Sequence, residues 1–206
     1  MPVARLIDNA DAGWLLRLLT FDYVPEGYAE PGQFLTAAIG DDKPAFFAIA
    51  SSPGEKLQLL VKNQGEVAER LCRMAPGGEA TVSAVMGKGF PLHQVAGLEL
   101  VLLVNGSGIS AVRTVIRAEL AAGLPRPVHL FYGVLTPAHR SFSSELDEWA
   151  RAGVSVHLVV GEPDGTSWQG LTGYVQNCAH EMGLIREDVG VVLVGLPIML
   201  EQAKQM

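Results

Sequence analysis

Residues Gly97–Leu120, GLELVLLVNGSGISAVRTVIRAEL, decide how the rest of the chain is interpreted. The apolar run in Glu99–Val104 is typical of a parallel strand that is covered on both faces. The glycine-rich triplet Gly106–Gly108 follows this run directly. Beyond the triplet, apolar residues recur at helical spacing, namely Ile109, Val112, Val115, Ile116 and Leu120. The sequence therefore predicts a strand over 99–105, a turn, and a helix over 110–121.

The turn between this strand and this helix has the features of an anion site. The first N–H groups of a helix have no partner within it, the helix dipole is positive at that end, and glycine lets a phosphate approach the backbone. Gly106–Ala111 also fits the G-x-G-x-x-G/A pattern of dinucleotide-binding turns. A nucleotide is therefore the expected ligand. The alternative is a turn that only packs the helix close to the strand.

The composition of the chain excludes several classes of protein. Its 206 residues are 49% hydrophobic and 18% charged, which is typical of a globular protein with a sizeable core. A formal net charge of −7 and scattered basic residues do not indicate nucleic-acid binding. Cys72, Cys178 and the five histidines lack the spacing of metal ligands, so no metal site is expected. Without a secretory signal or an apolar run of ~18 residues, we expect a cytoplasmic protein with no membrane span.

Residues 1–94 have the pattern of a small antiparallel barrel. Short runs of strand-forming residues alternate with turn residues every ~8–12 positions. The expected strands are Trp14–Phe21, Gln33–Ile39, Ala45–Ser51, Leu57–Lys62 and Glu79–Val85. Val67–Met74 is expected to be the one short helix among them, because Val67, Leu71 and Met74 share one side.

From Gly97 onward, strands alternate with helices, which is typical of a parallel sheet with crossover helices. The expected strand and helix pairs are 99–105 with 110–121, 127–132 with 141–151, 154–160 with 173–182, and 190–195 with 197–205. The segment Pro91–Gly97 marks the change of pattern. We therefore predict two domains, a β-barrel at 1–96 and an α/β nucleotide-binding domain at 97–206.

Motifs in both halves resemble those of the ferredoxin–NADP reductase superfamily, flavoproteins with a flavin-binding barrel and a pyridine-nucleotide domain. In the second half, the family's GTGIAPxR, YGxR, F..EL..WA and CGPPxM motifs resemble Gly106–Arg113, Tyr132–Leu135, Phe142–Ala150 and Gly195–Met199. In the first half, its RxYSIAS, GxxS and GPxGxF motifs correspond to Ala45–Ser51, Gly65–Ala68 and Met86–Phe90. A plant subfamily from fruit and chloroplast sequences shares further motifs, which here cover Lys43–Ser51, Val85–Phe90, Gly106–Arg113 and Trp168–Gln176.

The resemblance implies a FAD site in the barrel and an NAD(P)H site in the second domain, which is shortened at its C-terminus relative to the family. Phe47 is expected to stack on the flavin, while two backbone segments hold its phosphates. The flavin-side residues are Phe46, Phe47, Ala48, Ile49, Ala50, Ser51, Lys62, Gly65, Val67 and Ala68. The residues expected to cradle or line the nucleotide are Gly106, Ser107, Gly108, Ile109, Arg113, Tyr132, Gly133, Gly195, Leu196, Pro197 and Met199.

Several positions depart from the family motifs. Ala45 replaces the arginine that neutralises the flavin pyrophosphate, and Ala48 and Ala68 replace hydroxyl-bearing residues. Val194 replaces the cysteine near the hydride-transfer position. The loop at 160–165 has two acidic residues where the family often has serine and arginine for the 2′-phosphate, so NADH is expected in preference to NADPH.

The function that the resemblance implies is flavin-dependent electron transfer between NAD(P)H and an acceptor. A one-electron carrier or an enzyme subunit would then be a separate partner, because the chain has no cluster ligands of its own. The replacements at Ala45, Ala48, Ala68 and Val194 favour an alternative, a degenerate reductase-fold subunit or assembly module without redox catalysis.

Overall fold

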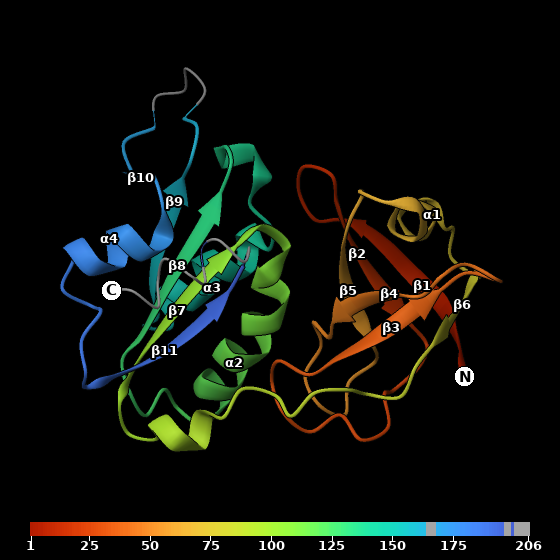
Figure 1. Cartoon of the computed structure of the whole chain (residues 1–206), viewed down its shortest axis with the longest axis horizontal. Helices are drawn as coiled ribbons and strands as arrows, with labels where there is room; N and C mark the ends of the chain where they lie inside the picture. The colour runs from red at the N-terminus through yellow and green to blue at the C-terminus, as the bar shows by residue number, and fades with distance from the viewer. Residues whose placement is uncertain (164–167, 196–198, 200–206) are drawn as a thin grey trace.

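The computed structural model describes residues 1–163, 168–195 and 199, and it shows two β-sheets side by side (Figure 1). The first sheet is antiparallel and the second is parallel. The segment between them contains the 3-10 helix η1 (Leu92–Val95). The expected fold class, a barrel-like sheet followed by a parallel-sheet α/β unit, is confirmed. The division into domains at 1–96 and 97–206 stays a prediction.

Six strands form the antiparallel sheet in the order β4-β3-β6-β1-β2-β5. They are β1 (Val3–Asp11), β2 (Leu16–Phe21), β3 (Phe34–Ala38), β4 (Ala45–Ala48), β5 (Gln58–Lys62) and β6 (Glu79–Val82). The two edge strands meet just beyond β4, where a bridge pairs Ile49 with Leu59 and the Ala50 N–H donates to the Gln58 carbonyl at 2.8 Å. The sheet is therefore nearly closed on itself. Helix α1 (Glu66–Arg73) packs against β5.

The interior of this sheet is filled by large apolar side chains, because alternate residues of a strand point to the same face. The fully buried ones include Leu6, Leu19, Phe21, Leu35, Ile49, Leu57, Leu59 and Leu71. Their burial supplies the hydrophobic stabilisation that holds β4 and β5 in place.

The parallel sheet has the order β10-β9-β8-β7-β11. Its strands are β7 (Glu99–Asn105), β8 (Val128–Val134), β9 (Ser155–Val160), β10 (Leu171–Thr172) and β11 (Val189–Val194). The connections carry helices α2 (Ile109–Ala121), α3 (Ser143–Arg151) and α4 (Val175–Glu181), and the 3-10 helices η2 (Gly106–Gly108) and η3 (Pro137–His139). None of the described helices is long and apolar enough to cross a membrane.

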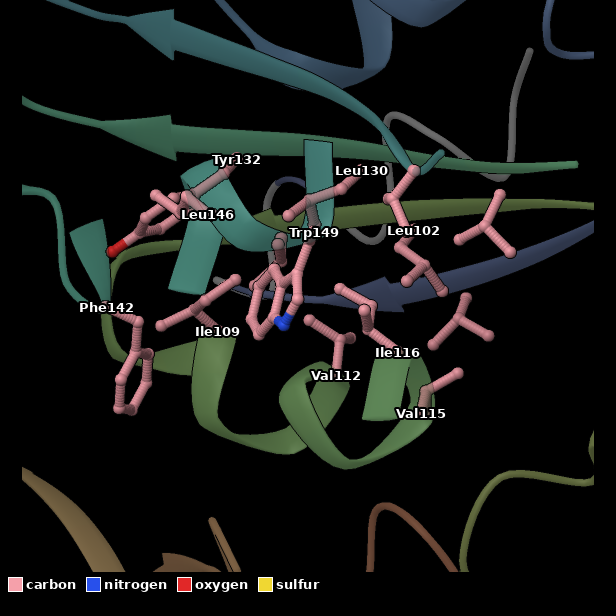
Figure 2. Close-up of a cluster of buried hydrophobic side chains, with 14 of the residues drawn as sticks. Leu102, Ile109, Val112, Val115, Ile116, Leu130, Tyr132, Phe142, Leu146 and Trp149 are labelled. Carbon is pink, nitrogen blue, oxygen red and sulfur yellow. The ribbon is translucent and has the colours of Figure 1, made fainter. Parts of the chain in front are cut away.

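Both faces of the parallel sheet are covered, which explains why β7 is apolar along most of its length. On one face, side chains of α2 and α3 such as Val112, Ile116 and Trp149 pack against Leu102 and Leu130 (Figure 2). On the other face, α4 covers a second cluster that contains Val101, Leu103 and Phe131. Because the strand is buried on both sides, its period-2 alternation disappears.

The two sheets share an apolar boundary at helix α2. Leu16 of β2 and Leu60 of β5 belong to the same buried cluster as the residues of α2. Figure 1 shows α2 between the parallel sheet and the antiparallel sheet. The turn η2 also lies against β5, so the expected nucleotide turn and the expected flavin-binding half are neighbours.

The element boundaries differ from the sequence prediction at a few places. Strand β1 was not expected, because only Ala4 and Leu6 along it are buried and the pattern of the rest is irregular. Strand β10 has two residues, too few for any periodic signal. The strand expected from Trp14 begins at Leu16, since Leu15 has a φ of 56° and belongs to a turn. Apart from Met199, the helix expected at 197–205 lies outside the described residues.

The strands expected at 45–51 and 79–85 are also shorter than predicted. Strand β4 ends at Ala48 rather than at Ser51, and β6 ends at Val82 rather than at Val85. In the first case the chain leaves β3 and pairs instead with β5 through Ile49. A change of pairing partner depends on a distant strand, so the local pattern does not indicate it.

Candidate functional site

The nucleotide turn lies at the carboxyl end of β7, as expected. Gly106 has a φ of +53° and begins the tight turn η2, and α2 follows at Ile109. No side chain caps the start of α2. The Ser110 hydroxyl donates instead to the Ser107 carbonyl at 2.9 Å. The Ile109 N–H, the first of α2, already donates to the Gly106 carbonyl within the turn, so an anion at this end of the 13-residue helix would be stabilised by the helix dipole and by the N–H groups of the turn itself.

Glycine at position 108 permits a close approach between helix and sheet. A Cβ atom there would lie 2.9 Å from Cγ1 of Val194 and 3.2 Å from Cγ2 of Val104. Any larger residue would push α2 away from β7 and β11. The packing role that the sequence analysis offered as an alternative is therefore present, and it coexists with an uncapped helix start.

Three expected site residues meet at the carboxyl edge of the parallel sheet, namely Gly133, Gly195 and Met199, and Asn105 lies among them. The Asn105 side chain occupies the space that a Cβ of Gly133 would fill, and it donates through Nδ2 to Sδ of Met199 at 2.9 Å. A Cβ at Gly195 would lie 2.6 Å from the same sulfur. Leu196 and Pro197 lie outside the described residues. Asn105 was missed by the sequence analysis, although it is the polar residue that ends an apolar strand.

Tyr132 does not line a cleft. It is fully buried under α2 and α3 (Figure 2), and its hydroxyl accepts a hydrogen bond from the Ser141 N–H at 3.1 Å. Burial raises the pKa of this phenol. The motif therefore identifies a residue that supports the site from the core.

Arg113 has partners other than a phosphate. Only 3% of the residue is exposed, and its guanidinium donates to the Glu145 carboxylate, to the Ala50 carbonyl and to the Gln58 side chain. The Phe142 ring lies 4.5 Å below the guanidinium carbon. With these groups occupied, Arg113 is not placed to neutralise a pyrophosphate at the turn. Gln58, the polar first residue of an otherwise apolar strand, was also missed by the sequence analysis.

The two phenylalanines of β4 point to opposite faces of the strand. Phe47 lies opposite Leu35 and packs against the buried interior of the antiparallel sheet. Phe46 points outward, is 70% exposed, and makes an edge-on contact with the Phe34 ring at 5.9 Å. The exposed aromatic face of this strand therefore belongs to Phe46. Ala48, on the same outer face, is half-buried.

The backbone after β4 is largely committed to closing the sheet. The Ile49 N–H donates to the Gln33 carbonyl at 3.2 Å, and the Ala50 N–H is bonded to β5. The buried Ser51 hydroxyl oxygen accepts a hydrogen bond from the Gln58 N–H at 3.1 Å. Among the backbone N–H groups of Ile49, Ala50 and Ser51, which were expected to bind the flavin or its phosphates, the first two thus already have protein partners.

The start of α1 is the second expected phosphate site. Gly65 has a φ of +93°, with open space where its Cβ would be, and no side chain caps the helix. Val67 and Ala68 are buried, and Glu66 and Glu69 place negative charge in the first turn. Lys62 is exposed at the end of β5. The N–H groups are free of side-chain caps, but the nearby acids oppose an anion.

The carboxyl end of β9 shows part of the loop expected to choose between NADH and NADPH. The N–H groups of Gly161 and Glu162 donate to the carbonyls of Val134 and Leu135 at 2.9 and 2.7 Å. Glu162 is exposed at this edge. Residues 164–167 lie outside the described residues.

Comparisons with known proteins agree with this geometry. A family model described as "Oxidoreductase NAD-binding domain" matches residues 102–205. "Fruit protein pKIWI502" of Actinidia deliciosa is 26% identical over 99% of this chain and 71% of its own length. "Ferredoxin--NADP reductase B" of Sorangium cellulosum is 29% identical over 91% of this chain and 80% of its own length.

A solved structure supports the fold along the whole chain. The cytochrome P450 reductase GcoB of Amycolatopsis superimposes with a TM-score of 0.84 at 21% identity, over 99% of this chain and 65% of that protein. The turn at the end of β7, the paired sheets and the family match together lead to one conclusion. The chain belongs to the oxidoreductase NAD-binding domain family and has the fold of the ferredoxin–NADP reductases.

Proposed function

We propose that this protein is a flavin-dependent oxidoreductase that transfers electrons between NAD(P)H and an acceptor. The observation that carries the proposal is the uncapped start of α2 behind Gly106–Gly108, set at the carboxyl edge of a parallel sheet and against β5 of the antiparallel sheet. Ligands of open α/β sheets bind at this edge. The names of the relatives, a ferredoxin–NADP reductase among them, point to the same chemistry.

The nucleotide pyrophosphate would be held by backbone groups rather than by a cation. Gly106 has open space at its Cβ position, which leaves room for a phosphate beside the turn. The N–H groups and dipole of α2 supply the attraction, since Arg113 is buried among other partners. The exposed Glu162 carboxylate would repel a 2′-phosphate, so we propose NADH as the preferred nucleotide over NADPH.

The flavin, which we propose to be FAD, fits the outer surface of β4 and the start of α1. The exposed Phe46 ring offers a stacking face, and Gly65 leaves the α1 N–H groups accessible. Ala45 stands where the resembling family has the arginine for the flavin pyrophosphate, and Glu66 adds a negative charge in the first turn of α1. The residues present therefore fit an aromatic ring better than they fit its diphosphate, and we expect the flavin to dissociate readily.

When bound, the two cofactors supply the hydride and electron chemistry, and the protein positions them. Asn105, Gly133 and Met199 shape the sheet edge on which the nicotinamide half would rest. A separate electron carrier or enzyme subunit would receive the electrons. A cytoplasmic setting is likewise our proposal, and the free thiols of Cys72 and Cys178 agree with the reducing conditions there.

A second candidate function is favoured by specific contacts. The hydrogen bonds of Arg113, Ile49 and Ala50 use groups that the resemblance assigns to cofactors. In a reductase fold that is retained only as a subunit or assembly module, these polar groups would bond to protein partners in this way. This alternative predicts a colourless protein that takes up no flavin and binds either a nucleotide alone or no cofactor.

The nucleotide turn is tested at Ser107, which is half-exposed and has no strained backbone. We expect Ser107→Glu to weaken NADH binding by about tenfold or more, since its carboxylate would oppose the pyrophosphate. Ser107→Gln is the matched control, with the same size and no charge. Calorimetry with NADH gives both dissociation constants. Equal affinity for the two variants would show that the nucleotide does not bind at this turn.

A further inference from the structure

Arg113 connects both sheets of the molecule through a single buried guanidinium. It lies in the second turn of α2, one turn beyond the nucleotide turn. Its Nη1 donates to the Ala50 carbonyl at 2.7 Å and to Oε1 of Gln58 at 2.7 Å, both beside the edge where the antiparallel sheet closes. These contacts join α2 to the connection between β4 and β5.

The other edge of the same guanidinium is bound to α3. Nε donates to Oε2 of Glu145 at 2.9 Å, and Nη2 donates to Oε1 at 2.7 Å, in the parallel arrangement that a carboxylate and a guanidinium favour. The Phe142 ring supports the guanidinium from one face. Phe142 has a φ of 56°, an uncommon conformation for a side chain of this size. The planar donor fork is therefore fixed in distance and in direction.

Arg117 reinforces this arrangement one turn further along α2. Its Nη2 lies 3.4 Å from Oε2 of Glu145, and its Nη1 lies 3.2 Å from the Glu55 carboxylate in the connection between β4 and β5. Arg117 is more exposed than Arg113, so its ion pairs are weaker. Glu145 is thus paired with two arginines, and each of these also contacts the connection between β4 and β5.

We propose that Arg113, held by Glu145, is a positioning residue that sets the spacing between the nucleotide turn and β4. This inference rests on the proposed function. Arg113 follows Gly108 of the nucleotide turn by five residues. Its guanidinium contacts Ala50, which follows Phe46 of β4 by four residues. A small displacement between a hydride donor and its acceptor costs rate far more than it costs binding. The arginine of the turn motif therefore acts on geometry and not on the phosphate.

Glu145→Gln is the direct test, because it removes the charge of the carboxylate while retaining its shape. We expect the limiting rate of flavin reduction at saturating NADH, measured by stopped flow, to fall about tenfold or more. The dissociation constant for NADH should change little, since Glu145 bonds to Arg113 and not to the turn that would bind the nucleotide. Glu148→Gln, an exposed change on the same helix, is the matched control and should leave both quantities unaltered.

A second variant covers the case in which Glu145→Gln does not fold. Gln58→Met removes one acceptor on the antiparallel sheet and leaves the ion pair intact. It should lower the same limiting rate with the same small effect on NADH affinity. An unchanged rate in either folded variant, or a parallel loss of rate and affinity, would overturn the positioning role.

Hydrogen exchange separates this inference from the proposed function. If NADH does not reduce flavin on the unaltered protein, the proposed function fails. The restraint that Arg113 and Glu145 place on the antiparallel sheet can still be measured without cofactors. The amides of Ala50 and Gln58 should then exchange faster in Glu145→Gln than in Glu148→Gln. Equal exchange in the two variants would show that Glu145 does not restrain the antiparallel sheet.

Discussion

Ala45 begins β4 at the position where the resembling family has an arginine for the flavin pyrophosphate. Arg113 is buried among protein partners, and the N–H groups of Ile49 and Ala50 are bonded to the backbone. These groups are therefore not available to bind the flavin phosphates. Ala45 itself packs with Phe47 against the interior of the sheet, so the affinity for flavin should respond to a single charge added on the outer face of β4.

We expect Ala48→Arg, on the outer face of β4 beside Phe46, to tighten FAD binding by about tenfold or more, because a charge-assisted hydrogen bond contributes roughly 1.5–3 kcal/mol. Ala48→Gln controls for side-chain size. Fluorescence titration with FAD and with riboflavin measures the effect, and riboflavin, which lacks phosphate, should show no gain. Equal gains for the two ligands, or none for FAD, would mean that the diphosphate does not pass this end of β4.

At the scale of elements, β8 and β9 carry a histidine pair on the face of the sheet that α4 covers. His157 stacks on Phe131 with 4.4 Å between ring centres, and His129 lies parallel to it at 6.1 Å. Burial and the neighbouring His129 hold the pKa of His157 below its ordinary value. The Glu99 carboxylate lies 2.6 Å from Nε2 of His129 and also pairs with Arg186, so charges of both signs border the pair.

This pair predicts a loss of stability in mild acid. The unfolded chain binds a proton at His157 near the ordinary histidine pKa of about 6.5, whereas the folded chain resists protonation until a lower pH. Stability should therefore fall as the pH drops below that value. His157→Gln should reduce the fall, and the exposed His180→Gln should not. Urea denaturation at pH 7.5 and 5.5 tests this, and identical pH dependence in all three proteins would contradict it.

Elements with a local signal were predictable from the sequence. The boundaries of β7 agree with the expected 99–105, because an apolar run stops at a glycine turn. Strand β1 was missed because it is specified by pairing with β2 and β6 rather than by its own pattern. The roles of Arg113 and Phe47 were not predictable, since a motif gives a residue's position but not its partners, and Ala50 is 63 residues from Arg113.

At the scale of the whole molecule, α2 lies between the two sheets (Figure 1), and the turn η2 at its start lies against β5 of the antiparallel sheet. Apolar contacts through Leu16 and Leu60, and the hydrogen bonds from Arg113 to Ala50 and Gln58, hold the two halves together. The fold is that of a reductase, and the family is one of NAD-binding oxidoreductases. What the molecule does with that fold depends on whether flavin and NADH bind together.

The most direct measurement is a visible absorption spectrum of the protein peak after gel filtration on a column equilibrated with FAD, followed by anaerobic addition of NADH. The account predicts a flavin band that remains with the protein and bleaches when NADH is added. A protein that retains no flavin at any FAD concentration, or a bound flavin that NADH leaves oxidised, would contradict a reductase in which this chain joins the two cofactors.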